Sequence, residues 1–206
     1  MTTITNAAIY DLVQDSTQLL EALERQLDAL PAAGALLEQH QQLHRELLHR
    51  QQSGERAIEE WRRALARRWE CEVAGQRLYL NVQRELVAYF GPASQALLIF
   101  LRGDEREHDA AQLLADLRQL HAALAITHGV PTAATDYLPD LVLACDALDD
   151  ALHWSNRCEQ QRHRAFLDRH LSQQAYQQVR ERTQRTLATP VANLVADMPV
   201  SVAPER

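Results

Sequence analysis

Several histidines and one glutamate recur at the three- and four-residue steps that place side chains on one face of a helix. His40 and His44 are four residues apart, and so are Glu159 and His163. Two such pairs on neighbouring helices could offer nitrogen and oxygen ligands to a transition metal such as iron or zinc. The candidate metal ligands on the predicted apolar faces are His40, His44, His121, Glu159, His163 and His170.

The same side chains could instead be structural. A buried imidazole can hydrogen-bond to a neighbouring helix and fix the register between the two helices, as polar residues do in coiled-coil seams. We favour this second interpretation, because spacing by itself specifies a metal site only weakly. No cofactor is therefore expected, and a transition metal is the alternative.

Two E-x-x-H motifs, Glu46 with His49 and Glu105 with His108, have the spacing of ligands in ferritin-like di-iron bundles. Such ligands must face the interior of the bundle. At about 100° per residue, both motifs lie well away from the neighbouring apolar faces. A di-iron site of this kind is therefore disfavoured.

Few residues suggest nucleophilic catalysis, and we assign no catalytic residue. Cys145 falls on an apolar face, where a thiol usually packs as a small hydrophobic group, whereas Cys71 and Cys158 are predicted to point outward. Trp61 and Trp69 are two helical turns apart and are predicted to be core residues. Four arginines could hold phosphate, but the glutamates among them favour a salt-bridged helix face. These are Arg62, Arg63, Arg67 and Arg68.

The composition predicts that helices position these side chains. Leucine and alanine fill 63 of the 206 positions, while valine and isoleucine fill 16. Unbranched side chains keep their rotamer freedom in a helix, and leucines at steps of three and four lie on one helix face. The sequence therefore predicts an all-α protein, an elongated antiparallel helical bundle of about six helices.

Glycine, proline and serine residues set the predicted helix ends. Ser53 with Gly54, and Ser172 as a cap, are expected to interrupt two otherwise continuous patterns. The helices are predicted over residues 6–30, 32–51, 55–90, 93–101, 104–128, 138–170 and 172–188.

The chain is predicted to be a single domain over residues 1–188, with an extended or disordered tail over residues 189–206. Two stretches also share leucine, glutamine and histidine positions, which suggests an internal repeat of residues 32–101 and 104–188. Such a repeat would give two duplicated helical hairpins, but leucine-rich helices also resemble one another by chance.

The charge and the cysteine content limit the classes of function that the chain can have. The formal net charge is -7 and the 21 basic residues are all arginine, which argues against a general nucleic-acid binder, because such binding neutralises phosphates. The most apolar run, residues 96–101, is far shorter than the roughly 20 residues of a membrane helix. Three widely spaced cysteines form no disulfide framework. We expect a cytoplasmic protein without a secretion signal or a membrane span.

The charges are distributed unevenly. Residues 104–150 carry ten acidic residues and two arginines, whereas residues 151–185 carry seven arginines and three acidic residues. These oppositely charged stretches could pair within one subunit or between subunits.

We therefore expect a non-catalytic binding or assembly protein, a scaffold or adaptor that docks a protein partner or self-associates into a homo-oligomer. This expectation rests on the regular apolar stripes and on the opposed charge blocks. The alternative is a metal- or ligand-binding bundle that uses the histidines and the glutamate named above. A third possibility is a phosphate or nucleic-acid contact through the arginines of residues 151–185.

Overall fold

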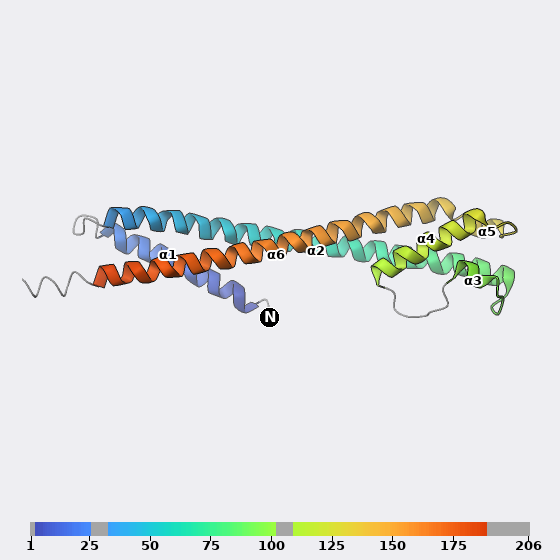
Figure 1. Cartoon of the computed structure of the whole chain (residues 1–206), viewed down its shortest axis with the longest axis horizontal. Helices are drawn as coiled ribbons and strands as arrows, with labels where there is room; N and C mark the ends of the chain where they lie inside the picture. The colour runs from blue at the N-terminus through green and yellow to red at the C-terminus, as the bar shows by residue number, and fades with distance from the viewer. Residues whose placement is uncertain (1–2, 26–32, 102–108, 189–206) are drawn as a thin grey trace, which may run out of the picture. The chain divides into compact units, whose positions relative to one another are not determined.

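Helices form all the regular secondary structure in the described part of the computed structural model, which covers residues 3–25, 33–101 and 109–188 (Figure 1). The predicted all-α class is thereby confirmed. The helices are α1 (Thr3–Arg25), α2 (Ala33–Phe90), α3 (Leu97–Phe100), α4 (Ala110–Ile126), α5 (Thr132–Thr135) and α6 (Leu138–Ala188). The predicted helix end at residue 30, the helix start at residue 104 and the tail over residues 189–206 lie outside the described residues.

Two of the predicted helix breaks are wrong. Helix α2 continues through Ser53 and Gly54, and α6 continues through Ser172. A glycine inside a helix costs about 1 kcal/mol relative to alanine, which is less than the burial of one leucine side chain contributes. Leu47 and Ala64, on either side of Gly54 along α2, are buried, so packing of both flanking segments keeps α2 helical.

Glycine forms the turns after α2 and α4, as predicted. Gly91 has φ of +85° and Gly129 has φ of +80°, a region that glycine enters without steric strain. The Gly91 N–H donates to the Val87 carbonyl oxygen at 2.9 Å and closes α2. Helix α3 is shorter than the predicted helix over residues 93–101, and α4 ends at Ile126.

The chain packs as two compact units, and the two long helices contribute to each of them. Unit 1 consists of Met1–Arg56 and His163–Arg206, and unit 2 consists of Ala57–Arg162. The single domain over residues 1–188, the elongated form and the internal repeat of residues 32–101 and 104–188 stay predictions.

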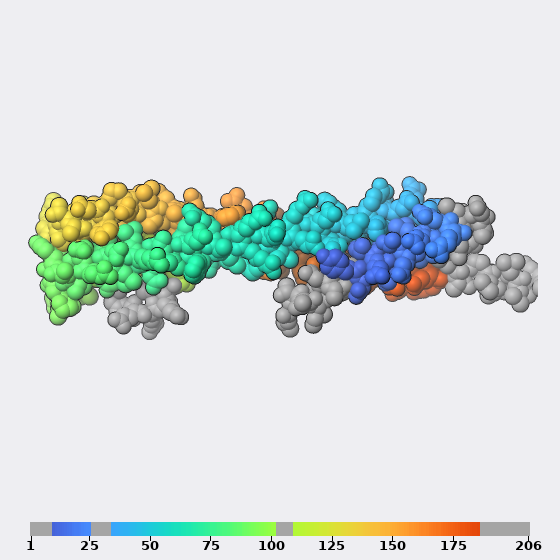
Figure 2. Space-filling view, turned by 180° about the vertical axis from the view of Figure 1, so that it is seen from behind, coloured from blue at the N-terminus to red at the C-terminus, as the bar shows by residue number. Residues whose placement is uncertain are grey.

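In unit 1, α1 lies along the first part of α2, with the last part of α6 beside it (Figure 2). The Tyr10 hydroxyl of α1 donates to the Glu55 carboxylate of α2 at 2.8 Å, and Ser16 hydrogen-bonds to His44 further back along α2. As residue numbers rise along α1, those of its partners on α2 fall. The two helices are therefore antiparallel.

Helices α2 and α6 also run antiparallel in unit 1. His40 contacts Thr183, and Arg50 pairs with Asp168, so partners again change in opposite order along the two helices. The small apolar core of this unit contains Leu12 from α1, Leu47 from α2 and Tyr176 from α6.

Unit 2 contains the larger apolar core. Its buried members include Val82, Leu86, Leu97, Phe100, Leu113, Leu117, Leu120, Leu141 and Leu148, from α2, α3, α4 and α6. A Cβ atom added to Gly75 on α2 lies 3.1 Å from the Leu117 Cδ1 atom on α4. Because glycine has no side chain, α4 can pack closely against α2 at this position.

After Leu152, each buried position of α6 lies one residue before the position that was predicted to be buried. Glu159, which was predicted to lie on an apolar face, is exposed, while Cys158 is buried. The same one-residue difference holds at the end of the predicted stripe, where His170 is exposed and Arg169 is buried. A step of one residue turns a side chain by about 100°, so the small error moves the predicted residues off the interior face.

A similar shift affects α2 after Leu65. Trp69 was predicted to be core but is 65% exposed, whereas Cys71 is buried. Cys158 is buried as well, so the prediction that Cys71 and Cys158 point outward is wrong. Cys145 is buried as expected, and burial raises the pKa of its thiol, mainly by removing water from the thiolate.

Candidate functional site

The predicted metal ligands occupy contrasting environments. His40 is buried and His44 is half-buried on α2 in unit 1. His121 on α4 is half-buried, whereas Glu159 on α6 is exposed, and both residues belong to unit 2. His163 and His170 on α6 are exposed in unit 1. The prediction that the three α6 residues face the interior is therefore wrong, because of the register difference described above.

His40 joins α2 to α6 in the interior of unit 1. Its side chain is 1% exposed, and its Nε2 atom lies 2.7 Å from the Thr183 hydroxyl oxygen. The imidazole also packs edge-on against the Tyr176 ring, with the centroids 5.9 Å apart and the planes at 84°. Its Nδ1 atom has no hydrogen-bond partner among the described residues. A neutral ring with hydrogen on Nε2 leaves only an acceptor unpaired, which is less costly than an unpaired N–H group.

His44 joins α2 to α1. Its Nδ1 atom hydrogen-bonds to the hydroxyl of Ser16, which is fully buried. The Ser16 hydroxyl donates its hydrogen to the Val13 carbonyl oxygen at 2.8 Å. Because a hydroxyl has a single hydrogen to donate, the His44 Nδ1 atom must carry the hydrogen and donate to Ser16. The contact with Ser16 therefore places hydrogen on the Nδ1 atom of His44.

Together Ser16, His40, His44, Tyr176 and Thr183 form what we call the histidine–hydroxyl cluster. Burial lowers the pKa of His40 and of His44, because the low-dielectric interior disfavours a charged imidazolium. Burial raises the pKa of Tyr176 to about 12, although Arg180 and Ser16 act in the opposite direction. The Tyr176 hydroxyl lies near Ser16 without forming a hydrogen bond of ordinary geometry. The cluster is thus uncharged at neutral pH.

A serine beside a histidine can indicate a nucleophile with its general base, but this pair has other roles. Ser16 is fully buried and its hydrogen is already donated to a backbone carbonyl. A nucleophile must be reachable by substrate and must give its proton to the base. Ser16 and His44 therefore form a contact between helices.

The described residues contain no group of three or more histidine, cysteine, aspartate or glutamate side chains placed to hold a metal ion. His40 and His44 each direct one ring nitrogen to a hydroxyl on a different helix. Metal binding by the predicted ligands stays a prediction, and elemental analysis of untagged protein tests it.

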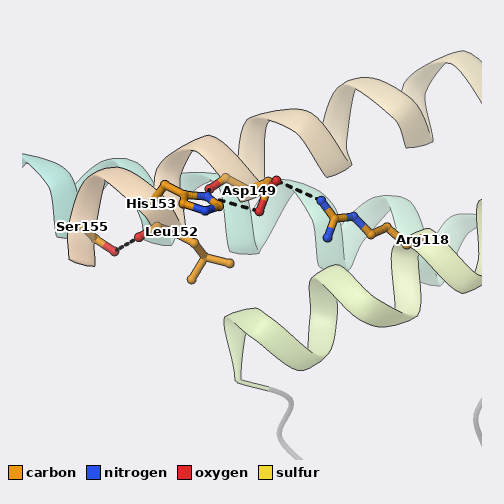
Figure 3. Close-up of polar contacts among 5 residues, drawn as sticks. All are labelled: Arg118, Asp149, Leu152, His153 and Ser155. Atoms are coloured by element: carbon orange, nitrogen blue, oxygen red, sulfur yellow. Dashed lines mark hydrogen bonds and ion pairs between the residues drawn. The ribbon is translucent and has the colours of Figure 1, made fainter. Parts of the chain in front are cut away.

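Opposite charges from different helices pair within the chain. In unit 2, Arg118 on α4 donates to the Asp149 carboxylate on α6 at 2.9 Å, and His153 also contacts Asp149 (Figure 3). In unit 1, Arg180 on α6 pairs with Asp15 on α1 at 3.1 Å. Neither arginine pair joins the acidic stretch over residues 104–150 to the basic stretch over residues 151–185, so pairing of the two stretches stays a prediction.

The arginine-rich part of α2 is a salt-bridged surface, as predicted. Its ion pairs are Arg63 with Glu59, Arg67 with Glu70 and Arg68 with Glu72. Each pair joins residues three or four apart, the spacing at which side chains on a helix surface meet. Trp61, predicted to be core, is half-buried and has the Arg162 guanidinium 4.3 Å from its ring centroid.

Two members of the cluster, Tyr176 and Thr183, were not predicted from the sequence. Arg169, Tyr176 and Thr183 are seven residues apart, and this heptad spacing indicates a shared helix face. All three residues are buried.

Searches against models of protein families, curated proteins and solved structures find no match.

Proposed function

We propose that the chain is a non-catalytic assembly protein that binds a second copy of itself. The observation that carries this proposal is the exposed surface of α6, which combines large apolar side chains with charges of opposite sign. Its exposed apolar residues are Val142, Leu143, Trp154, Phe166, Leu167 and Leu171. Leu143 is 67% exposed and Leu171 is 62% exposed, so leucine is available for contact in both halves of the helix.

The exposed charges of α6 make this helix complementary to itself. Asp146 and Asp150 are exposed in its first half, whereas Arg157 and Arg164 are exposed further along. None of these four side chains forms an ion pair with a described residue. In an antiparallel contact between two copies of α6, the acidic part of each helix faces the basic part of the other. Charge complementarity therefore favours a second copy over an unrelated partner.

The oligomeric state in solution tests the proposal. Light scattering should give twice the mass of the chain. Reversing the acidic charges with Asp146→Arg and Asp150→Arg should shift the protein toward monomer, and so should the pair Arg157→Asp and Arg164→Asp. Because self-complementarity requires both signs, the variant that combines all four changes should recover the dimer.

Two further measurements separate this mechanism from unfolding or a different interface. Circular dichroism should show unchanged helix content in each variant. Leu80→Ser, at an exposed position on α2, is the control and should leave the mass unchanged. A monomeric wild-type chain would overturn the proposal and leave docking of another protein as the function to examine.

A cytoplasmic location is part of the same proposal and depends on the number and spacing of the cysteines.

A further inference from the structure

The two histidines of the histidine–hydroxyl cluster connect all three helices of unit 1. His40 on α2 contacts Thr183 on α6, and His44, one turn later, contacts Ser16 on α1. Both contacts use neutral hydroxyl partners. The cluster therefore accommodates neutral imidazole and supplies no carboxylate for an imidazolium.

The position of an added proton follows from these hydrogen bonds. With hydrogen on Nε2, His40 would take its second proton on Nδ1, the atom without a hydrogen-bond partner among the described residues. His44 carries hydrogen on Nδ1 and would take its second proton on Nε2. The proton on His40 places a positive charge in the interior, and the proton on His44 places one at a half-buried position; both are unfavourable without a partner of opposite charge.

The neighbouring ionisable groups do not provide a dedicated partner. From α6, Tyr176 is held as a neutral phenol and Arg180 is positively charged. From α1, Asp15 already pairs with Arg180 at 3.1 Å. On α2 itself, Glu46 pairs with Arg50, and Arg45 donates to the Gln41 carbonyl oxygen.

We propose that His40 and His44 form an acid-sensitive latch, in which protonation of the two imidazoles releases α1 and the end of α6 from α2. The latch goes beyond self-association, because the contacts that carry it lie within one chain. While both imidazoles are neutral, they keep the three helices of unit 1 together. Once the two rings are protonated at lower pH, their charges favour an opened unit 1 in which water can solvate them.

The direction of the pH effect follows from the lowered pKa of both histidines in the folded state. The unfolded chain takes up protons first, near the ordinary pKa of about 6.5. The stabilising effect of the neutral rings is therefore fully present above that pH and is lost as the pH falls through it toward the folded-state pKa. Over that window, each histidine reduces the folding equilibrium constant by up to about tenfold per pH unit.

Hydrogen–deuterium exchange of the full chain tests the latch, because it reports on the two units separately. Protection factors, corrected for the intrinsic effect of pH on exchange, should fall between pH 7.5 and pH 5.5 in peptides from residues 10–25 and 176–185. Peptides from α4 in unit 2 should keep their protection. An equal loss in both units, or no loss in unit 1, would overturn the proposal.

Substitutions that keep the hydrogen bonds and remove the titration isolate the cause. Glutamine places its amide near the His40 Nε2 position and asparagine near the His44 Nδ1 position, so the variant combines His40→Gln with His44→Asn. This variant should lose most of the pH dependence in unit 1. His163→Gln is the matched control, because His163 is an exposed histidine of the same unit, and it should behave like the wild type.

A measurement on the wild-type chain keeps the latch testable if the double variant does not fold. NMR titration of the imidazole Cε1–H signals should give pKa values below the ordinary range for His40 and His44. Titration of both His40 and His44 at or above the ordinary pKa would overturn the latch.

Discussion

His40 and His163 have the same side chain in opposite environments. His40 is 1% exposed and hydrogen-bonds to Thr183, whereas His163 lies on the exposed surface of α6. Burial lowers the pKa of His40, because the interior disfavours the charged imidazolium. Their positions on helix faces determine this difference, although both were candidate metal ligands by spacing.

Tyr176 gives a second test of the cluster, at alkaline pH. Burial raises its pKa to about 12 in the folded chain, while the unfolded chain ionises near the ordinary value of about 10. Stability from the neutral phenol is therefore present below about pH 10 and is lost as the pH rises toward 12. Tyr176→Phe should make the alkaline loss of stability shallower, as measured by urea unfolding from pH 9 to pH 11.5.

The same substitution should change the free energy of unfolding at neutral pH by less than about 1 kcal/mol, because the lost hydroxyl lacks a well-formed hydrogen bond. Tyr89→Phe is the control, since Tyr89 is 58% exposed. Equal alkaline sensitivity in wild type and in Tyr176→Phe would contradict the assigned environment of the phenol.

Helix α2 contains two buried glycines that have different surroundings. A Cβ atom at Gly54 meets no atom within 4 Å, whereas at Gly75 it meets two leucines of α4. A residue with higher helix propensity could thus replace Gly54, whereas Gly75 allows α4 to pack closely against α2. Both glycines leave α2 continuous, because tertiary packing outweighs a local propensity cost of about 1 kcal/mol.

Substitutions at these glycines should have opposite effects. Gly54→Ala should raise the free energy of unfolding by about 1 kcal/mol, because alanine is the better helix former and the space for its methyl group exists. Gly75→Leu should lower the free energy of unfolding by about 1–3 kcal/mol, because its side chain overpacks the contact with α4. Urea unfolding followed by circular dichroism measures both. Changes in the same direction would contradict this packing.

For the chain as a whole, the proposed self-association would link assembly to stability. A dimer is favoured by mass action, so the midpoint of thermal unfolding should rise with protein concentration. The variant that combines Asp146→Arg with Asp150→Arg should show a smaller dependence, because it weakens the contact between copies. A wild-type midpoint that is independent of concentration would contradict a dimer that dissociates on unfolding.

The sequence by itself determined the all-α class and the glycine turns after α2 and α4. Leucine periodicity and glycine conformation act locally, within a few residues along the chain. The sequence also singled out His40 and His44 and suggested their structural use. The sequence pattern was sufficient here because each histidine has leucines three or four residues away on the same side of α2.

Only the tertiary structure decided the interior face in the second half of α6. Beyond Leu152 this helix has few leucines, and its buried positions include Ser155, Arg169 and Thr183. Such residues become interior through the helices that pack on them, so the stripe cannot be followed from hydrophobicity. The partners of the two histidines, Thr183 from α6 and Ser16 from α1, likewise depend on contacts between distant segments. These contacts fix the register and determine which imidazoles are shielded from water.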